Sequence, residues 1–162
     1  MQKKKINEEE IMLRLNKTMY KNVYGEELKP CSGSGMAMTG FTRDGRCINR
    51  DDDHGSHHVC VNIHMDSLKG GNFCNVTGQS DWCSRPMPCH EDQTKMCDAQ
   101  NWCVCEWAFS SYINNAGGCD MIADVDCDAT NMKVLEHYKE AASQSPDVAN
   151  ALQCLKQRCN LG

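Results

Sequence analysis

Thirteen cysteines in a chain of 162 residues constrain this protein more than any other feature of its sequence. That density approaches the ~8–10% at which cysteine usage indicates a disulfide framework or metal sites. The length suits a single domain with a core of its own, so disulfides would add to burial and not replace it. Cross-linking on this scale favours an oxidising compartment, because thiols stay reduced in the cytosol.

The expected compartment is an organelle lumen, such as that of the thylakoid, or the extracellular space. The first ten residues, MQKKKINEEE, lack the apolar stretch of a signal peptide. This setting therefore requires that a leader was removed ahead of Met1. The alternative is a reducing compartment, cytoplasmic or stromal, in which the thiols stay free.

Charge and hydropathy exclude several classes of function. The net charge is −5, and no cluster of basic residues forms a face for phosphate backbones, so nucleic-acid binding is not expected. No apolar run approaches the ~20 residues that cross a bilayer, so no transmembrane span is expected. The phosphate-binding, dinucleotide-binding and nucleophile-elbow glycine motifs are absent from the sequence.

Local patterns predict an α+β domain with a small mixed or antiparallel sheet, short helices and disulfide-stapled loops. Asn7 precedes an acidic turn and an apolar stripe, which predicts a helix over 7–17. Apolar and polar residues alternate over 57–63 and again over 101–109, which predicts two strands. The segment 120–126 predicts a third strand.

Helix signals occur mainly in the last third of the chain. The strand over 101–109 is expected to pass into a short helix that ends at Gly117-Gly118. Thr130 is a candidate cap for a helix that runs to about Ala142. Ser145 followed by Pro146 predicts the start of a final helix.

Ordered motifs along the chain resemble the family known as domain of unknown function 2237. The resemblance covers roughly residues 22–142 and implies a small α+β fold without implying a reaction. The motifs that carry it are Asn22-Val23-Tyr24-Gly25, Pro30-Cys31-Ser32, Thr39-Gly40-Phe41, Arg43-Asp44-Gly45-x-Cys47, Asp53-x-Gly55-Ser56-His57-x-Val59-Cys60, Ser84-x-Pro86-x-Pro88 and Trp102-Cys103-Val104-Cys105.

This resemblance divides the chain into three parts. Residues 1–20 form an N-terminal helical arm, residues 21–142 the family-like domain, and residues 143–162 a C-terminal helix. A Cys-rich insertion interrupts the domain at about 73–100. The chain has Thr130-Asn131-Met132 where the family usually has a Thr-His-Glu triplet, and His54 and His58 are private to this chain.

The resemblance also separates the cysteines into two groups. The family-like set is Cys31, Cys47, Cys60, Cys103 and Cys105. Because free cysteines are usually buried, its members are expected to be buried free thiols. Disulfides or a metal site among them are the alternatives. The other eight cysteines suggest local disulfides, although sequence alone does not fix the connectivity: Cys74/Cys83, Cys89/Cys97, Cys119/Cys127 and Cys154/Cys159.

One segment is dense in residues that bind metals. The weak metal candidates are His54, His57, His58 and Cys60, which follow Asp51-Asp52-Asp53. On a strand, His58 and Cys60 share a face while His57 points away, and the spacing matches no established zinc pattern. The expectation is therefore no bound cofactor, with zinc as the alternative.

The preferred hypothesis is a non-catalytic accessory or linker subunit of a larger assembly, attached at the periphery of a membrane-associated complex. Its arms and Cys-rich loops would contact neighbouring proteins. No catalytic residue is assigned under this hypothesis. The alternative is a metal- or thiol-dependent enzyme that uses His57 with Cys60, Cys103 or Cys105. The residues expected to form the family-motif core are Cys31, Cys47, Asp53, His57, Cys60, Trp102, Cys103 and Cys105.

Overall fold

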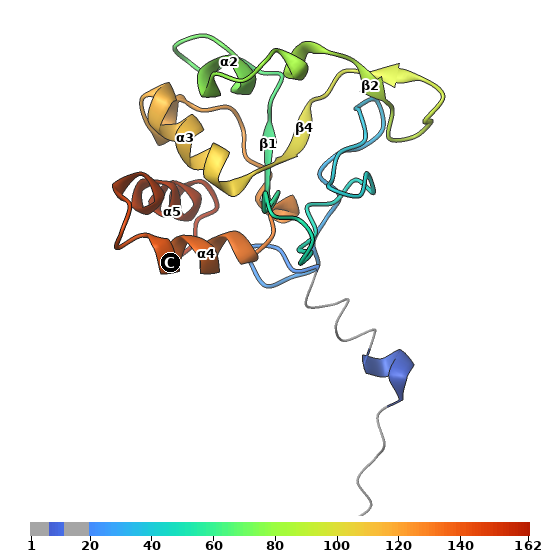
Figure 1. The fold of residues 1–162 in the computed structure, drawn as a ribbon, viewed down its shortest axis with the longest axis horizontal. Helices are drawn as coiled ribbons and strands as arrows, with labels where there is room; N and C mark the ends of the chain where they lie inside the picture. The colour runs from blue at the N-terminus through green and yellow to red at the C-terminus, as the bar shows by residue number, and fades with distance from the viewer. Residues whose placement is uncertain (1–6, 12–19) are drawn as a thin grey trace, which may run out of the picture.

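The computed structural model describes residues 7–11 and 20–162 (Figure 1). In the first range, the Asn7 side chain accepts a hydrogen bond from the Glu10 backbone N–H at 2.7 Å. The Asn7 carbonyl accepts one from Ile11 at 3.1 Å, so Asn7 caps a helical turn as expected. The rest of the predicted N-terminal arm lies outside the described residues.

Two small antiparallel sheets give the fold its β component, which confirms the predicted α+β class. Strand β1 (Val59–Asn62) pairs with β4 (Asn101–Val104), and Cys60 lies opposite Cys103 in the register. Strand β2 (Met87–Pro88) pairs with β3 (Met96–Cys97). The predicted strand over 120–126 does not form; Val125 makes only an isolated bridge to Val61.

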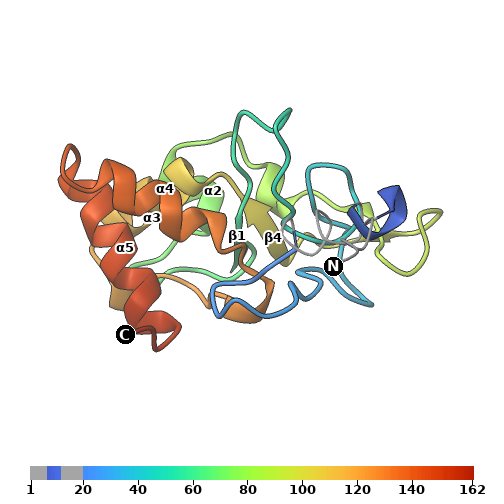
Figure 2. The same ribbon diagram turned by 90° about the horizontal axis from the view of Figure 1, so that it is seen from below.

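The helices of the domain lie beside the β1–β4 sheet (Figures 1 and 2). They are α2 (Phe73–Thr77), α3 (Glu106–Ala116), α4 (Lys133–Ala141) and α5 (Pro146–Arg158), with short 3₁₀ turns η1 (Trp82–Ser84), η2 (Cys119–Met121) and η3 (Cys127–Ala129). Helices α3, α4 and α5 gather at one end of the molecule and the β2–β3 hairpin lies at the other, with β1 and β4 between them (Figures 1 and 2).

Several helix boundaries follow from local chemistry. The Ser145 hydroxyl accepts from the Val148 N–H and Pro146 opens α5, as predicted. Gly117 ends α3 in the left-handed conformation with φ 98°, a conformation that glycine adopts without steric cost. The Thr130 side chain does not cap α4: it accepts from the Cys60 N–H and donates to the Asp126 carbonyl.

Only the first half of the predicted strand over 101–109 forms. It stops at Val104, and Cys105 is the residue that precedes α3. Trp107 and Phe109 are therefore helical and do not line the face of a strand with Cys103. Phe109 instead enters the main apolar core between the helices and the sheet.

Twelve of the thirteen cysteines form disulfides. Four of the five family-like cysteines are paired, as Cys31–Cys60 and Cys47–Cys103, so the expectation of buried free thiols was wrong for them. Of the four local pairs proposed from sequence, two form, and both lie in the insertion: Cys74–Cys83 and Cys89–Cys97. The remaining four pair crosswise and not locally, as Cys119–Cys154 and Cys127–Cys159.

The crosswise pairs join α5 to the rest of the domain. Cys154 and Cys159 lie on or just after α5, and their partners Cys119 and Cys127 belong to η2 and η3. Local pairs would have closed loops within single segments, whereas these two bonds tie the C-terminal helix to the segment that follows α3. Packing of α5 against α3 and α4 decides the partner of each cysteine, and short-range spacing does not contain that information.

A partly buried carboxylate next to η3, that of Asp126, gives the folded state a dependence on pH. Burial raises the pKa of Asp126, while the Ala129 N–H partly opposes the shift. Because an acid with a raised pKa in the folded state is protonated more readily there than in the unfolded chain, stability falls as pH rises from about 4 through the folded-state pKa. We expect Asp126→Asn to raise Tm at pH 7 and to flatten this dependence.

Thermal unfolding of both proteins between pH 4 and pH 8 measures this effect. Asp147→Asn, on the exposed first turn of α5, is a matched control in which a carboxylate becomes an amide outside the buried site. A Tm of Asp126→Asn equal to or below that of the native chain at pH 7 would contradict the prediction.

Candidate functional site

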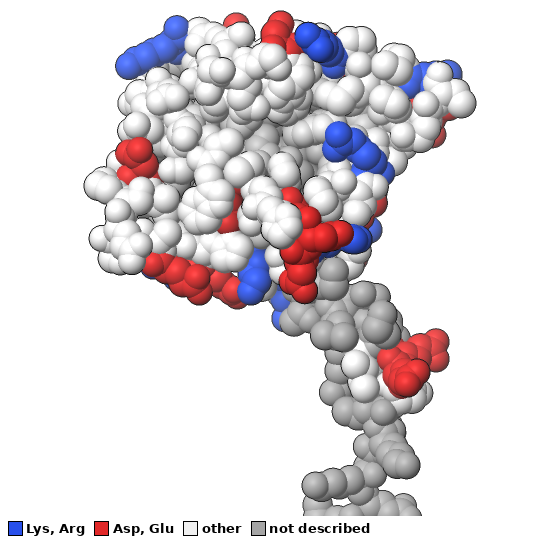
Figure 3. Space-filling view, in the orientation of Figure 1, with Lys and Arg blue, Asp and Glu red and all other residues white. Residues whose placement is uncertain are grey.

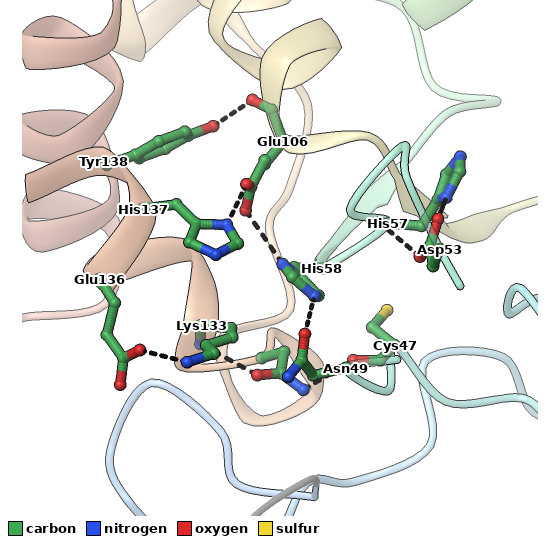
Figure 4. A network of polar contacts seen from close by, with 11 residues as sticks. Cys47, Asn49, Asp53, His57, His58, Glu106, Lys133, Glu136, His137 and Tyr138 are labelled. Carbon is green, nitrogen blue, oxygen red and sulfur yellow. Dashed lines mark hydrogen bonds and ion pairs between the residues drawn. The ribbon is translucent and has the colours of Figure 1, made fainter. Parts of the chain in front are cut away.

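The best-defined polar arrangement in the molecule is a buried carboxylate between two imidazole rings (Figure 4). Oε2 of Glu106 lies 3.0 Å from Nδ1 of His58, and Oε1 contacts Nδ1 of His137. The side chains of His58 and Glu106 are 2% and 0% exposed, and that of His137 is 30% exposed. We call His58, Glu106 and His137 the polar centre.

Three different elements supply the polar centre. His58 directly precedes β1, Glu106 is the first residue of α3, and His137 lies in the middle of α4. A carboxylate in the first turn of a helix is stabilised by the positive end of the helix dipole. The centre therefore forms only where the sheet, α3 and α4 meet, which explains why no local motif contains it.

Tyr138 fixes the distance between α3 and α4 at this point. Its hydroxyl donates a hydrogen bond to the backbone carbonyl of Glu106, and its ring is fully buried. Burial, the negative charge of Glu106 and the nearby Cys105 together raise the pKa of Tyr138 well above its ordinary value. The phenol consequently stays protonated across the physiological range and remains a hydrogen-bond donor.

The hydrogen bonds of His58 define where its protons lie. Nε2 faces Oδ1 of Asn49 at 3.1 Å, and an amide oxygen only accepts, so Nε2 carries a proton. In a neutral ring Nδ1 then presents a lone pair to Oε2 of Glu106. Two lone pairs at hydrogen-bond distance repel, so a positive charge must lie between them: either a proton or a metal ion.

His137 connects the polar centre to the surface. Its ring stacks on Trp107 with centroids 6.5 Å apart and planes 13° from parallel. Both side chains line a surface hollow of about 280 Å³, together with Ser56, Glu140, Ala141 and Gln144. Solvent and small solutes in this hollow can reach His137, while Glu106 and His58 lie buried behind it.

The structure separates the four metal candidates drawn from sequence. His54 is exposed, and Cys60 is buried in a disulfide. His57 instead pairs with Asp53: its Nδ1 lies 2.7 Å from Oδ1, and its backbone N–H donates to Oδ2 at 2.9 Å. Only His58 belongs to a group of converging ligands.

The thiol candidates separate in the same way. Cys60 and Cys103 are oxidised, and Cys105 is the one free cysteine in the described part of the chain. Cys105 and His57 both line a hollow of about 100 Å³ that Trp82, Trp102 and neighbouring residues complete. Cys105 thus keeps a thiol near a histidine, and the two side chains line the same hollow without a hydrogen bond between them.

Sequence analysis missed two of the three residues of the polar centre. Glu106 falls within the predicted strand over 101–109 and His137 within the predicted helix that runs to about Ala142, and no sequence pattern marks either as a site residue. A faint signal did exist for Glu106, because a charged residue follows Trp102-Cys103-Val104-Cys105 within an otherwise apolar run. A charge at such a position is rarely buried unless it is paired.

Two further groups of ligand-type side chains occur among the described residues. One consists of Cys31, Cys47 and Cys103, and the other of Cys89, Glu91 and Cys97. All five cysteines are in disulfides, and a disulfide sulfur is no longer the thiolate that binds a metal. The polar centre is the one group whose three ligand atoms are all available.

Comparison with known proteins gives a family and no reaction. A family model described as "Uncharacterized protein conserved in bacteria (DUF2237)" matches residues 21–145. No curated protein matches the chain. Within residues 7–11 and 20–162, no helix is long and apolar enough to cross a membrane.

Proposed function

We propose that this chain, which belongs to the DUF2237 family, is a non-catalytic accessory subunit of a larger protein assembly. The observation that carries the proposal is a set of large apolar side chains exposed to solvent. Leu68 is 77% exposed and Met96 is 61% exposed. Aromatic residues and methionine are enriched at protein interfaces, and burial on association would remove their cost in water.

The Cys-rich insertion supports this role through its geometry. Met96 lies on strand β3, and the Cys89–Cys97 disulfide closes the same hairpin. A hairpin that is already ordered loses little conformational entropy when it binds. The disulfides of the insertion therefore favour a preformed contact surface over a mobile loop.

The charge distribution also favours protein contacts. Much of the face seen in Figure 3 carries no charged side chain, and acidic residues line the edge formed by α4. Glu136 and Glu140 are exposed on that helix. A broad uncharged face with an acidic margin favours protein contacts, because charged residues are depleted at the core of an interface and occur at its rim.

The disulfides indicate where such an assembly would lie. Six disulfides in one chain indicate an oxidising environment. Within that class we propose an organelle lumen, such as that of the thylakoid, or the extracellular space. A peripheral position on a membrane-associated complex fits this proposal.

Co-purification from the native source tests the proposal. We expect deletion of residues 1–20 and the single substitution Met96→Gln each to reduce recovery of neighbouring proteins at least several-fold, while the domain stays folded. Lys95→Gln is the matched control, because it changes an exposed neighbour of Met96 without removing apolar surface. Cross-linking mass spectrometry would identify the partners.

Two measurements separate loss of contact from loss of folding. Circular dichroism and thermal unfolding must be unchanged in the deletion and in Met96→Gln. If both variants recover their neighbours as efficiently as the native chain does, neither the arm nor the hairpin binds the assembly, and the accessory role is contradicted.

The alternative role, a thiol-dependent enzyme built on His57, has fewer groups available to it. Its candidates Cys60 and Cys103 are in disulfides, so only Cys105 could act as a nucleophile. His57 is held by Asp53, which orients its ring, but within residues 7–11 and 20–162 the Cys105 sulfur makes no hydrogen bond to His57. We therefore keep the accessory role as the proposed function.

A further inference from the structure

We propose that His58, Glu106 and His137 form a binding site for a divalent transition-metal ion, with Zn²⁺ as the first choice. This inference does not depend on the accessory role. Each residue offers one ligand atom, and the three atoms lie within 4.8 Å of one another. Two imidazoles and one carboxylate are a ligand set that zinc uses when it retains an open position.

The polar centre requires a positive charge, and among the described residues the ion-pair partners of Glu106 are histidines and not lysine or arginine. The Glu106 carboxylate contacts the two imidazole rings, one at each oxygen. Its side chain is fully buried, where an unpaired carboxylate would be costly. Protons can bridge these contacts, and one divalent ion placed among the three ligand atoms satisfies all of them at once.

Asn49 supplies an independent observation that points to a ligand at Nδ1 of His58. Metal-binding histidines usually donate the N–H of the second ring nitrogen to a fixed acceptor, which sets the tautomer and the ring orientation. The Oδ1 atom of Asn49, 3.1 Å from Nε2 of His58, is such an acceptor. The lone pair of Nδ1 is thereby directed at the interior of the centre and not at solvent.

The surroundings of the other two ligands are also ordered. Tyr138 ties the backbone of Glu106 to α4, and Trp107 stacks on the ring of His137. Neither ligand has to move far to bind an ion, because all three elements already meet at this point. Ordered ligands and ordered outer contacts reduce the entropy cost of metal binding.

The identity of the ligands selects the ion. Two nitrogen donors disfavour Ca²⁺ and Mg²⁺, which prefer oxygen ligands. Imidazole and carboxylate suit zinc and the neighbouring first-row ions. With three protein ligands, a four-coordinate ion keeps one position for water or a small anion, and the 280 Å³ hollow beside His137 provides access to it.

Metal titration of the purified full-length chain tests the site. After treatment with a chelator under non-reducing conditions, the protein should bind one equivalent of Zn²⁺, and Co²⁺ should produce the visible absorption of a low-symmetry site. Binding should also raise Tm, because an ion bound at a free concentration of 100 times Kd adds about 2.7 kcal/mol to stability. No uptake of Zn²⁺ or Co²⁺ would overturn the proposal.

Substitutions locate the ion. We expect His137→Gln to weaken Zn²⁺ binding at least tenfold, and Asn49→Ala by about 10–100-fold as an outer contact. His137 is the best ligand to change because it is the most exposed of the three, so the variant should fold. His64→Gln removes an exposed histidine outside the centre and is the matched control.

Two results would contradict this assignment. One is Zn²⁺ affinity that is unchanged in both His137→Gln and Asn49→Ala while their circular dichroism matches the native chain. The other is a loss of affinity in His64→Gln equal to that in His137→Gln, which would show surface binding by histidines in general.

Discussion

A chain that ends at residue 145 is expected not to form a stable domain, although the family match also ends there. Helix α5 contributes Leu155, which is fully buried, together with Val148 and Leu152 to the main apolar core. It packs against α3 and α4. It contains Cys154 and is followed by Cys159, and each of these forms one of the crosswise disulfides. Its removal would uncover the faces of two helices.

The magnitude of this loss exceeds what a domain of this size can tolerate. Burial of Val148, Leu152 and Leu155 stabilises by roughly 1.5–3 kcal/mol each. Each crosswise disulfide, with sequence separations of 35 and 32, contributes about 3.5–4 kcal/mol in the chain-entropy account. Together these contributions reach the ~5–15 kcal/mol by which whole domains are stable.

The truncation is best made with Cys119 and Cys127 replaced by alanine, so that no unpaired thiols remain to form wrong disulfides. We expect loss of near-ultraviolet circular dichroism and of cooperative unfolding. In the full-length chain, Leu155→Ala should cost about 2–5 kcal/mol, whereas Gln153→Ala on the exposed face of α5 should have little effect. A truncated chain with native Tm would contradict the integral role of α5.

Sequence patterns predicted the parts of this fold that short-range chemistry controls. The cap at Ser145, the glycine stop at Gly117 and the two cysteine pairs of the insertion each depend on residues a few positions apart. Strand β1 follows from alternation over 57–63. The same local patterns predicted the α+β class, which the resemblance also implies and which the structure confirms.

The errors share a physical cause. At Cys105 the chain changes from a period of two to a period of 3.6, and no glycine or proline marks the change, so the predicted strand continued too far. Helix α2 was missed because its capping box uses Asn72 and Asn75, and not the more familiar serine and glutamate. Both are local signals of low specificity.

The polar centre was out of reach for a different reason. His58 and Glu106 are separated by 48 positions and Glu106 and His137 by 31. The positions of such residues relative to one another depend on how β1, α3 and α4 pack. The sequence does mark His58 as private to this chain. As a separate departure, Asn131 stands where the family usually has the histidine of its Thr-His-Glu triplet. The buried side chain of Asn131 now holds the Cys47 carbonyl.

The disulfide between Cys47 and Cys103 should contribute more to stability than any disulfide of the insertion. It joins the loop before β1 to strand β4 across 56 positions, and in the chain-entropy account a loop of that length gives about 4 kcal/mol. We expect the double substitution Cys47→Ala with Cys103→Ala to lower Tm by roughly 8–16 °C under non-reducing conditions. Both cysteines must be replaced, since a single unpaired partner could exchange with Cys105.

The Cys89–Cys97 disulfide provides the matched comparison. It spans only 8 positions within the β2–β3 hairpin, so its removal by two alanines should cost about 2.5 kcal/mol and a correspondingly smaller fall in Tm. The order of the two effects is the informative result, because both variants replace a pair of cysteines with the same residue. If removal of Cys89–Cys97 destabilises the protein more than removal of Cys47–Cys103, loop entropy does not set the contribution of these bonds. The Cys47–Cys103 disulfide would then contribute less to stability than the Cys89–Cys97 disulfide of the insertion.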